Sequence, residues 1–296
     1  MVESKSSTDQ KINILLAEDN PVNQEVIFEM LSSLCCRVEV VSDGKQAIEA
    51  AVSKNFDLIL MDCQMPVMDG HDSTRRIRLY EQQKGSGRIP IVGITGRAVQ
   101  GNYDKCKAAG MDDYLDKPFT IEKLKETVCH WTKTSFSYPI EQHIEEKSFS
   151  ESSTSEVPCN ELFDCLDKAA IRNICIFKKD PGKILEKLVG IYLRDAPIKF
   201  LEIRKGIYEK NPELVFQASH SLKSSSANVG ATALVSMSHE LEINSRSRMI
   251  DGAQTQLEKM ESEYIKVAEV LKSMVENPHN LDKVIASIIG TGDRDD

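Results

Sequence analysis

The sequence predicts a multidomain protein in which a doubly wound α/β unit is followed by an all-α bundle. In the first part of the chain, short apolar runs alternate with stretches of helical periodicity, a pattern typical of a parallel sheet covered on both faces. After a segment rich in Ser, Thr and Glu, only helical periodicity remains. We therefore assign residues 11–132 to the α/β unit, 133–160 to a flexible linker and 161–276 to the bundle. Residues 1–10 form a leader, and 277–296 form a tail that could contain a short helix.

The predicted strands of the α/β unit are apolar runs bounded by turn residues. They lie at 12–17, 56–61, 89–95 and 114–119. Helices are expected at 21–34, 44–53, 70–83, 99–109 and 120–131. This alternation predicts a (βα)5 unit.

The bundle is predicted from helix-start signals and from helical periodicity. The signals are Asp180-Pro181-Gly182 and Asn211-Pro212-Glu213. Further candidate helices lie at 164–175, 195–207, 231–244 and 251–275. Together they predict four long helices with short additions.

Acidic residues follow two of the predicted strands. Asp62 ends one apolar run, and Glu18 and Asp19 directly follow another. The carboxyl ends of parallel strands meet at the edge of the sheet where such folds bind ligands. Clustered carboxylates repel one another unless a divalent cation lies among them, and hard oxygen ligands favour Mg²⁺. A simpler interpretation stays open, in which Glu18-Asp19-Asn20 only caps the helix that begins at Pro21.

Two later strand ends add a hydroxyl group and a cation. Thr95 ends one apolar run, and Lys117 immediately precedes Pro118. A residue before proline favours an extended backbone, so the Lys117 ammonium is free to reach over the sheet edge. These groups suit phosphoryl transfer to a carboxylate, with Asp62 as the nucleophile and with Lys117 and the metal neutralising charge.

These residues resemble a response-regulator receiver domain, which has a flavodoxin-like fold. The residues that carry the resemblance occur in the expected order: Glu18, Asp19, Asp62, Thr95, Tyr114 and Lys117. The resemblance implies phosphorylation of Asp62 and a Mg²⁺ site made by the three acids and the backbone carbonyl of Gln64. It also implies that Thr95 and Tyr114 form the switch that reports phosphorylation. The runs A-E-D-N-P-V-N-Q and M-P-V-M-D-G are most similar to receivers of hybrid sensor kinases, whose usual output is another phosphotransfer step.

The helix that begins at Pro212 carries His220 at its centre, within Q-A-S-H-S-L-K-S-S-S-A-N-V-G-A. Apolar and small residues form a stripe along this helix: Val215, Ala218, Leu222, Ser226 and Val229. His220 and Lys223 lie off this stripe, so we expect both on one exposed face. The simplest interpretation is a solvent-facing histidine without function. A cation one turn away instead suits an incoming phosphoryl group, and small serines leave room for a docking partner.

Residues 161–276 resemble a histidine-containing phosphotransfer (HPt) domain, with His220 as the phospho-acceptor and Lys223 as its charge partner. Ser224 departs from the pattern, because the family commonly has glycine close to the acceptor. Since serine is also small, we expect slower or more selective docking rather than loss of transfer.

The combined resemblance implies a phosphorelay protein. Asp62 accepts a phosphoryl group from a sensor histidine kinase or a small phosphodonor and exchanges it with His220, which serves a downstream response regulator. The direction of transfer stays open. The sequence shows no ATP-binding pattern, so we do not expect a kinase. A free-standing protein and the tail of a hybrid kinase are both compatible, and the start at Met1 favours the former.

Two other functions stay open. In the first, phosphorylation switches the α/β unit and the bundle only docks partners. In the second, the acid cluster is a phosphatase site similar to that of haloacid-dehalogenase-like hydrolases. That class has D-x-D at its nucleophile, whereas Asp62-Cys63-Gln64 lacks the second acid.

Composition indicates a cytoplasmic protein. The net charge is −9 without a long basic run, which argues against nucleic-acid and anionic-membrane partners. No apolar stretch is long enough to enter a membrane, and the polar start is not a signal peptide. Eight cysteines occur without a CxxC pair, so we expect reduced thiols and no zinc site. No role is assigned to His71, His130, His143, His239 or His279.

A linker of about 28 residues spans roughly 30 Å, so the two units can meet within one chain.

Overall fold

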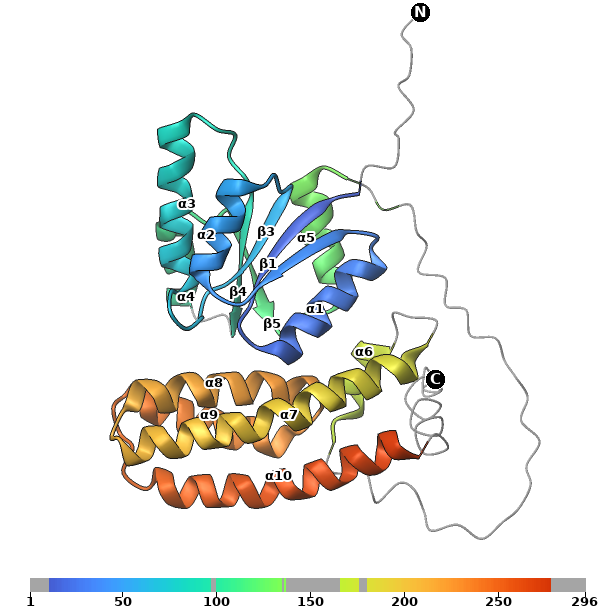
Figure 1. The fold of residues 1–296 in the computed structure, drawn as a ribbon, viewed down its shortest axis with the longest axis vertical. Coiled ribbons are helices and arrows are strands. Elements are labelled where there is room, and N and C mark those ends of the chain that lie inside the picture. Colours follow the sequence, from blue (N-terminus) through green and yellow to red (C-terminus); the bar gives the residue numbers. More distant parts are fainter. Residues whose placement is uncertain (1–10, 97–99, 135, 137–165, 176–179, 278–296) are drawn as a thin grey trace, which may run out of the picture.

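The fold was obtained as a computed structural model (Figure 1), which describes residues 11–96, 100–134, 136, 166–175 and 180–277. The predicted leader, most of the predicted linker and most of the predicted tail lie outside the described residues.

The α/β unit contains a five-stranded parallel sheet in the order β2-β1-β3-β4-β5. Its strands are β1 (Asn13–Ala17), β2 (Arg37–Val41), β3 (Leu58–Asp62), β4 (Ile91–Gly96) and β5 (Asp113–Lys117). Its helices are α1 (Pro21–Ser33), α2 (Gly44–Ser53), α3 (Gly70–Lys84), α4 (Gln100–Ala109) and α5 (Ile121–Thr132). The predicted doubly wound (βα)5 fold is confirmed.

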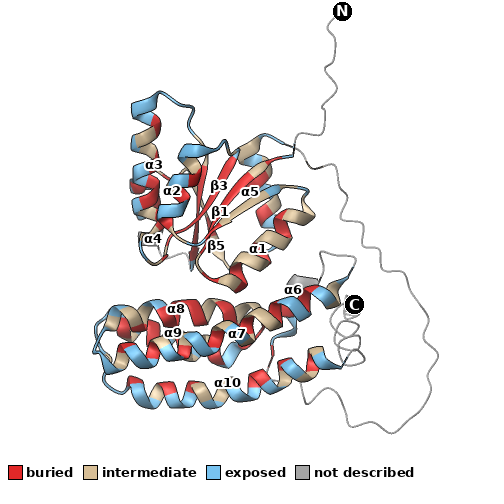
Figure 2. Ribbon diagram, viewed as in Figure 1, coloured by how far each residue is buried: buried red, intermediate tan, exposed pale blue. Residues whose placement is uncertain are grey.

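Strand β2 has no counterpart among the apolar runs that predicted the other four strands. Its sequence, Arg37-Val38-Glu39-Val40-Val41, alternates polar and apolar residues because β2 lies at the edge of the sheet. The inner strand β3 is buried along its whole length and was therefore readable as a continuous apolar run (Figure 2).

The second unit is a bundle of four long helices with one short addition in the described part of the chain. The short helix is α6 (Lys168–Cys175), and the long ones are α7 (Pro181–Tyr208), α8 (Pro212–Asn228), α9 (Thr232–Arg246) and α10 (Ala253–Glu276). The predicted all-α bundle is confirmed.

The prediction of a separate helix at 195–207 was wrong. Helix α7 runs continuously through Pro197, which lies inside it. Proline has no backbone N–H, so the carbonyl of Leu193 loses its usual helical donor. The hydroxyl of Tyr264 on α10 donates a long hydrogen bond of 3.5 Å to that carbonyl. The contact from Tyr264 therefore offsets the hydrogen bond lost at Pro197, a residue that in the sequence alone predicts a helix boundary.

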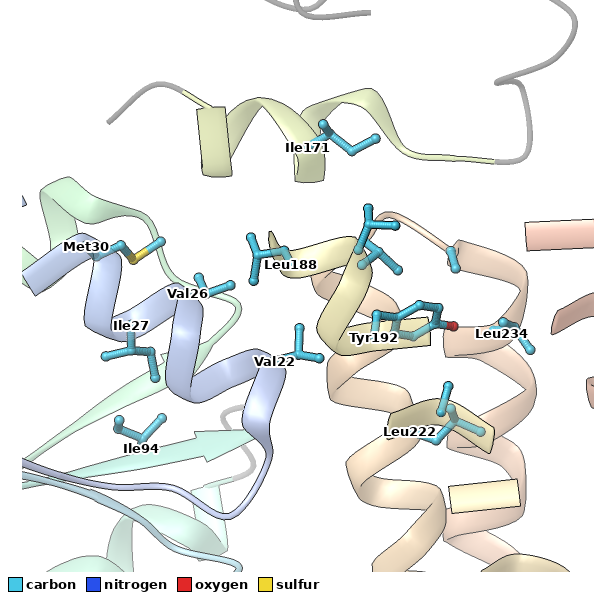
Figure 3. Packing of buried hydrophobic residues seen from close by; sticks show 14 of the residues in the cluster. Val22, Val26, Ile27, Met30, Ile94, Ile171, Leu188, Tyr192, Leu222 and Leu234 are labelled. Carbon is cyan, nitrogen blue, oxygen red and sulfur yellow. The ribbon is translucent and has the colours of Figure 1, made fainter. Parts of the chain in front are cut away.

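The two units pack against each other through α1, which lies on α7 and α8 (Figure 1). Val22 and Val26 of α1 and Leu188 of α7 belong to one apolar cluster that continues into the bundle core (Figure 3). Val22 and Leu188 are completely buried. This packing brings the carboxyl edge of the sheet over α8.

We expect Gly70→Ala to lower the free energy of unfolding of the α/β unit by roughly 1–3 kcal/mol. A Cβ atom at position 70 would lie 2.1 Å from the backbone oxygen of Asp62, which cannot rotate away. Trp131 is the only tryptophan of the chain and lies on α5, so its fluorescence during urea denaturation reports on this unit.

The matched control is Gly87→Ala, because an added Cβ at position 87 meets no atom within 4 Å. Equal urea midpoints for Gly70→Ala and Gly87→Ala would show that the close approach at Gly70 does not constrain the Asp62 loop.

Candidate functional site

Three carboxylates meet at the carboxyl edge of the sheet. Glu18 and Asp19 follow β1 and Asp62 ends β3, and each offers an oxygen within 4.8 Å of the others. Glu18 is completely buried, and Asp62 is 3% exposed. The structure therefore brings together the three acids that the sequence predicted as metal ligands. Carboxylate oxygens in such a cluster are ligands that Mg²⁺ prefers.

Lys117 reaches the same point from the end of β5. Its ammonium Nζ donates hydrogen bonds to Glu18 Oε2 at 2.7 Å and to Asp62 Oδ2 at 2.6 Å. A single cation thus bridges carboxylates from two strands. The position agrees with the prediction that Lys117 extends over the sheet edge.

The acids respond differently to this environment. Burial raises the pKa of Glu18 to about 8, and the charge of Asp62 adds to the effect. Burial and the same charge raise the pKa of Asp19 to about 6. Burial also disfavours the charged form of Asp62, but Lys117 and then His220 outweigh it and hold the pKa of Asp62 below its usual value. The raised pKa values of Glu18 and Asp19 reflect burial first and repulsion from Asp62 second, and a divalent cation would favour the ionised forms. The residues present therefore fit a Mg²⁺ ion.

Asn20 explains the competing interpretation of this segment. Its Oδ1 accepts hydrogen bonds from the N–H groups of Val22 at 2.9 Å and Asn23 at 3.1 Å, so Asn20 is the N-cap of α1. Glu18 and Asp19 instead belong to the carboxylate cluster. The structure thus assigns the capping role to Asn20 and places Glu18 and Asp19 in the carboxylate cluster, whose binding of a metal ion stays a prediction.

The remaining predicted residues of this edge lie close by. The hydroxyl of Thr95 donates to Asp116 Oδ1 at 2.9 Å, and the ring of Tyr114 packs edge-on against Tyr103. The backbone N–H of Gln64 donates to Asp62 Oδ1 at 3.0 Å. The switch role of Thr95 and Tyr114 and the metal-binding role of the Gln64 carbonyl stay predictions.

His220 lies on α8, as predicted, but the expectation of an exposed side chain was wrong. The residue is only 8% exposed, because the α/β unit covers this face of α8. His220 Nδ1 lies 2.7 Å from Glu242 Oε1. On the other side, a Cβ added to Gly96 at the end of β4 would lie 3.6 Å from His220 Cε1. The imidazole therefore lies between α9 and the sheet edge.

Glu242 on α9 is the site residue that the sequence did not reveal. Its second oxygen accepts a hydrogen bond from Lys223 Nζ at 2.6 Å, so the predicted cation is bound to Glu242 beside His220. His239 Nδ1 lies 3.3 Å from the same oxygen. Burial would raise the pKa of Glu242, but His220 and Lys223 outweigh it and lower the pKa to about 2. The run M-S-H-E-L-E contains Glu242, but only the packing of α9 on α8 shows which glutamate faces the histidine.

A polar contact at the sheet edge joins the two units beside His220. Asn20 Nδ2 donates to the backbone carbonyl of Ser221 at 2.8 Å and to its hydroxyl at 2.9 Å. Asn228 Nδ2 donates to Asn23 Oδ1 at 2.7 Å. A cavity of about 710 Å³ at this junction is lined by residues of both units, including Asp19, Gln64 and His220. His220 thus shares a cavity with Asp19 and Gln64 from the receiver edge of the junction.

Family comparisons match both units. The model of the response regulator receiver domain matches residues 14–129, and the model of the Hpt domain matches residues 187–277. The chain carries a receiver domain followed by an Hpt domain. The family resemblances derived from the sequence are confirmed.

Similar proteins include several sensor kinases. The sensor protein GacS of Pseudomonas syringae pv. syringae is 36% identical over 126 residues, which are 43% of this chain and 14% of GacS. Hybrid signal transduction histidine kinase G of Dictyostelium discoideum is 36% identical over 140 residues, which are 47% of this chain and 4% of that kinase. The chain therefore spans only a small part of the curated relatives that it matches.

The solved structures that resemble the chain include the receiver domain of sensor histidine kinase PA1611 from Pseudomonas aeruginosa PAO1. It is 46% identical, covers 42% of this chain and all of its own, and has a TM-score of 0.39. Among the described residues, none of the helices combines the length and the apolar character that crossing a membrane requires.

The Hpt domain is expected to lose stability at low pH through Glu242. Its pKa falls from an ordinary 4.5 to about 2, so its stabilising effect is complete above pH 4.5 and disappears as the pH falls towards 2. A shift of this size corresponds to about 3 kcal/mol at neutral pH. We expect Glu242→Gln to be less stable than the parent protein at pH 7 and the difference to shrink on acidification, as measured by urea denaturation at several pH values.

Glu240→Gln is the control, because Glu240 is an exposed residue of the same helix. If the stability difference between Glu242→Gln and the parent protein did not change with pH, Glu242 would not be the ionised partner of His220 and Lys223.

Proposed function

We propose that this chain is a phosphorelay protein in which Asp62 of the receiver domain and His220 of the Hpt domain exchange a phosphoryl group directly, within one chain. The proposal rests on the position of His220 in the same cavity as Asp19, which clusters with Asp62, and Gln64, which lies two residues after it. Phosphoryl transfer needs an acceptor in line with the donor, and side chains that neutralise the charge of the moving group.

In the step from Asp62 to His220, the lone pair of Nε2 attacks phosphorus. The P–N bond forms as the P–O bond to the Asp62 carboxyl group breaks, and the carboxylate keeps the electron pair. Lys117 Nζ, 2.6 Å from Asp62 Oδ2, stabilises that carboxylate. The reverse step uses the same groups, so the site supports transfer in both directions.

Glu242 prepares His220 for this step. Because its Oε1 lies 2.7 Å from Nδ1, Glu242 holds the proton on that nitrogen and leaves Nε2 as the nucleophile. Positive charge develops on the ring as the P–N bond forms, and the adjacent carboxylate stabilises it. Lys223 balances the charge of Glu242.

Mg²⁺ is the cofactor that the acid cluster would hold, through Glu18, Asp19 and Asp62. The receiver resemblance implies that the backbone carbonyl of Gln64 completes the set. When bound, the ion supplies positive charge for the phosphoryl oxygens. Asp62 is then the phosphorylated residue of the receiver domain, and Thr95 with Tyr114 is its proposed switch.

The proposed partners are a sensor histidine kinase that supplies the phosphoryl group and a response regulator that receives it from His220. A cytoplasmic location remains the expectation from composition. In the alternative function, the helical bundle would only dock partners. The alternative predicts that His220 is never phosphorylated.

The decisive experiment loads the purified protein with acetyl phosphate and Mg²⁺ and follows phosphate on Asp62 and His220 by mass spectrometry under conditions that preserve both linkages. In the parent protein, we expect phosphate to appear on His220 at a rate independent of protein concentration, because the acceptor is already in place. Asp62→Asn should abolish both signals, and His220→Gln should retain phosphate on Asp62.

A mixture of Asp62→Asn and His220→Gln separates transfer within a chain from transfer between chains. This mixture can phosphorylate His220 only between molecules, so its rate should rise with concentration and fall below that of the parent protein on dilution. Equal rates at every concentration would contradict direct exchange within one chain. Phosphate confined to Asp62 would favour the docking function.

The packing of the receiver domain on the Hpt domain is also expected to depend on the ion pair between Lys187 of α7 and Glu25 of α1. The charged atoms of this pair are 2.6 Å apart. Lys187→Glu places two like charges together, so we expect His220 phosphorylation within the chain to slow several-fold, in line with about 1 kcal/mol for a partly exposed pair. Quenched-flow measurements on Asp62-loaded protein give this rate.

The charge-swapped double variant Lys187→Glu with Glu25→Lys should recover the rate. Lys183→Glu is the control, because Lys183 on the same helix pairs with Asp180 instead of the receiver domain. Failure of the double variant to recover would show that the loss in Lys187→Glu comes from the Hpt domain itself.

A further inference from the structure

Two cysteines and a histidine come together on the side of the receiver domain where α3 and α4 pack. Cys63 directly follows β3, His71 is in the first turn of α3, and Cys106 lies on α4 (Figure 1). The two sulfur atoms are 3.5 Å apart, and Cys106 Sγ is 3.7 Å from His71 Nε2. The three ligand atoms lie within 4.8 Å of one another. The phosphorelay chemistry proposed above makes no use of this group of side chains.

The spacing is that of a chelating site. A tetrahedral zinc ion has Zn–S bonds of about 2.3 Å and Zn–N bonds of about 2.0–2.1 Å, which place two sulfurs about 3.8 Å apart and a sulfur and a nitrogen about 3.6 Å apart. The observed separations of 3.5 Å and 3.7 Å are close to these values, and small shifts of the side chains would make up the difference. The ligands come from three elements, so their convergence is a product of the tertiary fold.

The surroundings leave room for the sulfurs and place a carboxylate near the histidine. Both sulfurs lie against Gly93 of β4, where an added Cβ would be only 3.3 Å from Cys63 Sγ and 3.4 Å from Cys106 Sγ. Asp69 Oδ1 lies 4.0 Å from Nδ1 of His71, a charge contact longer than a hydrogen bond, and the other ring nitrogen, Nε2, lies 3.7 Å from Cys106 Sγ. A carboxylate in that position favours a proton on Nδ1 and leaves Nε2 as a ligand.

A cation can reach this group from solvent. The cysteines are 5% and 3% exposed, but the His71 side chain is 19% exposed. Cys63 and His71 also line the cavity at the junction of the two domains. The fourth coordination position would face this cavity and hold a water molecule, as in zinc sites with three protein ligands.

We propose that Cys63, His71 and Cys106 form a binding site for a thiophilic transition-metal ion, with Zn²⁺ as the ion that fits best. On binding, each thiol releases its proton to solvent as its S–Zn bond forms, and the neutral imidazole contributes the lone pair of Nε2. The site is distinct from the carboxylate cluster. Thiolate and imidazole ligands select Zn²⁺, whereas the oxygen ligands of Glu18, Asp19 and Asp62 select Mg²⁺.

The experiment uses the full chain, stripped of metal with a chelator and kept reduced. Zn²⁺ affinity is measured by competition with a chromophoric chelator, and Co²⁺ is added separately because cobalt–thiolate bonds give an intense near-ultraviolet absorption. The variants are Cys106→Ser and His71→Asn. Cys129→Ser, at a half-buried free cysteine on α5, is the matched control. Circular dichroism verifies that each variant is folded.

We expect one high-affinity Zn²⁺ per chain, a cobalt–thiolate band, and affinity at least about tenfold weaker in Cys106→Ser and His71→Asn but unchanged in Cys129→Ser. Zinc X-ray absorption of the parent protein should show about two sulfur neighbours near 2.3 Å, and this readout needs no variant. A shell of only nitrogen and oxygen, equal affinity in all variants, or no uptake would overturn the proposal. Formation of a Cys63–Cys106 disulfide by a protein that takes up no metal when reduced would also overturn it.

Discussion

The side chain of Asn20 joins the two domains at the point where their reactive residues meet. Its oxygen caps α1 and its amide nitrogen donates to Ser221, the neighbour of His220. A helix cap is a rigid position, because the backbone on both sides of it is fixed by hydrogen bonds. Asn20 also directly follows Glu18 and Asp19. The distance from the carboxylate cluster to His220 is thus set through a few consecutive residues.

Each reactive side chain lies beside an ionised partner, Lys117 for Asp62 and Glu242 for His220. Lys117 bridges Glu18 and Asp62, and Glu242 bridges His220 and Lys223. Isolated buried charges are costly, so these pairs are needed for the two sites to be buried together. They also suit the chemistry, since Lys117 stabilises the carboxylate that leaves and Glu242 stabilises the imidazole that accepts. Both groups of side chains are largely buried in the packed arrangement, which strengthens these interactions.

The receiver domain brings chemically different groups together on either side of β3. Asp62 ends that strand and faces the hard ligands Glu18 and Asp19, while the next residue, Cys63, lies with Cys106 and His71. Side chains alternate between the two faces of a strand, so consecutive residues can belong to separate sites. The neighbouring residues Asp62 and Cys63 would therefore bind different metal ions, a hard ion at the carboxylates and a soft ion at the thiolates.

The two fold classes could be predicted from local sequence patterns, because the alternation of buried runs and helices needs no knowledge of distant contacts. These patterns also predicted Glu18, Asp19, Asp62 and Lys117 as neighbours, since the strands of a parallel sheet end at one edge. The position of His220 on α8 followed from its helix. Each of these predictions rests on local periodicity or on a general property of parallel sheets.

Contacts between elements that are far apart in sequence could be known only from the tertiary fold. It buried His220, which helical periodicity had marked as exposed, because the α/β unit covers that face of α8. It placed Glu242 beside His220. It also kept α7 continuous through Pro197, where Tyr264 donates to the carbonyl of Leu193. It gathered Cys63, His71 and Cys106, whose spacing in the chain resembles no metal motif. In each case the deciding contact joins separate elements, and periodicity within one element carries no information about such contacts.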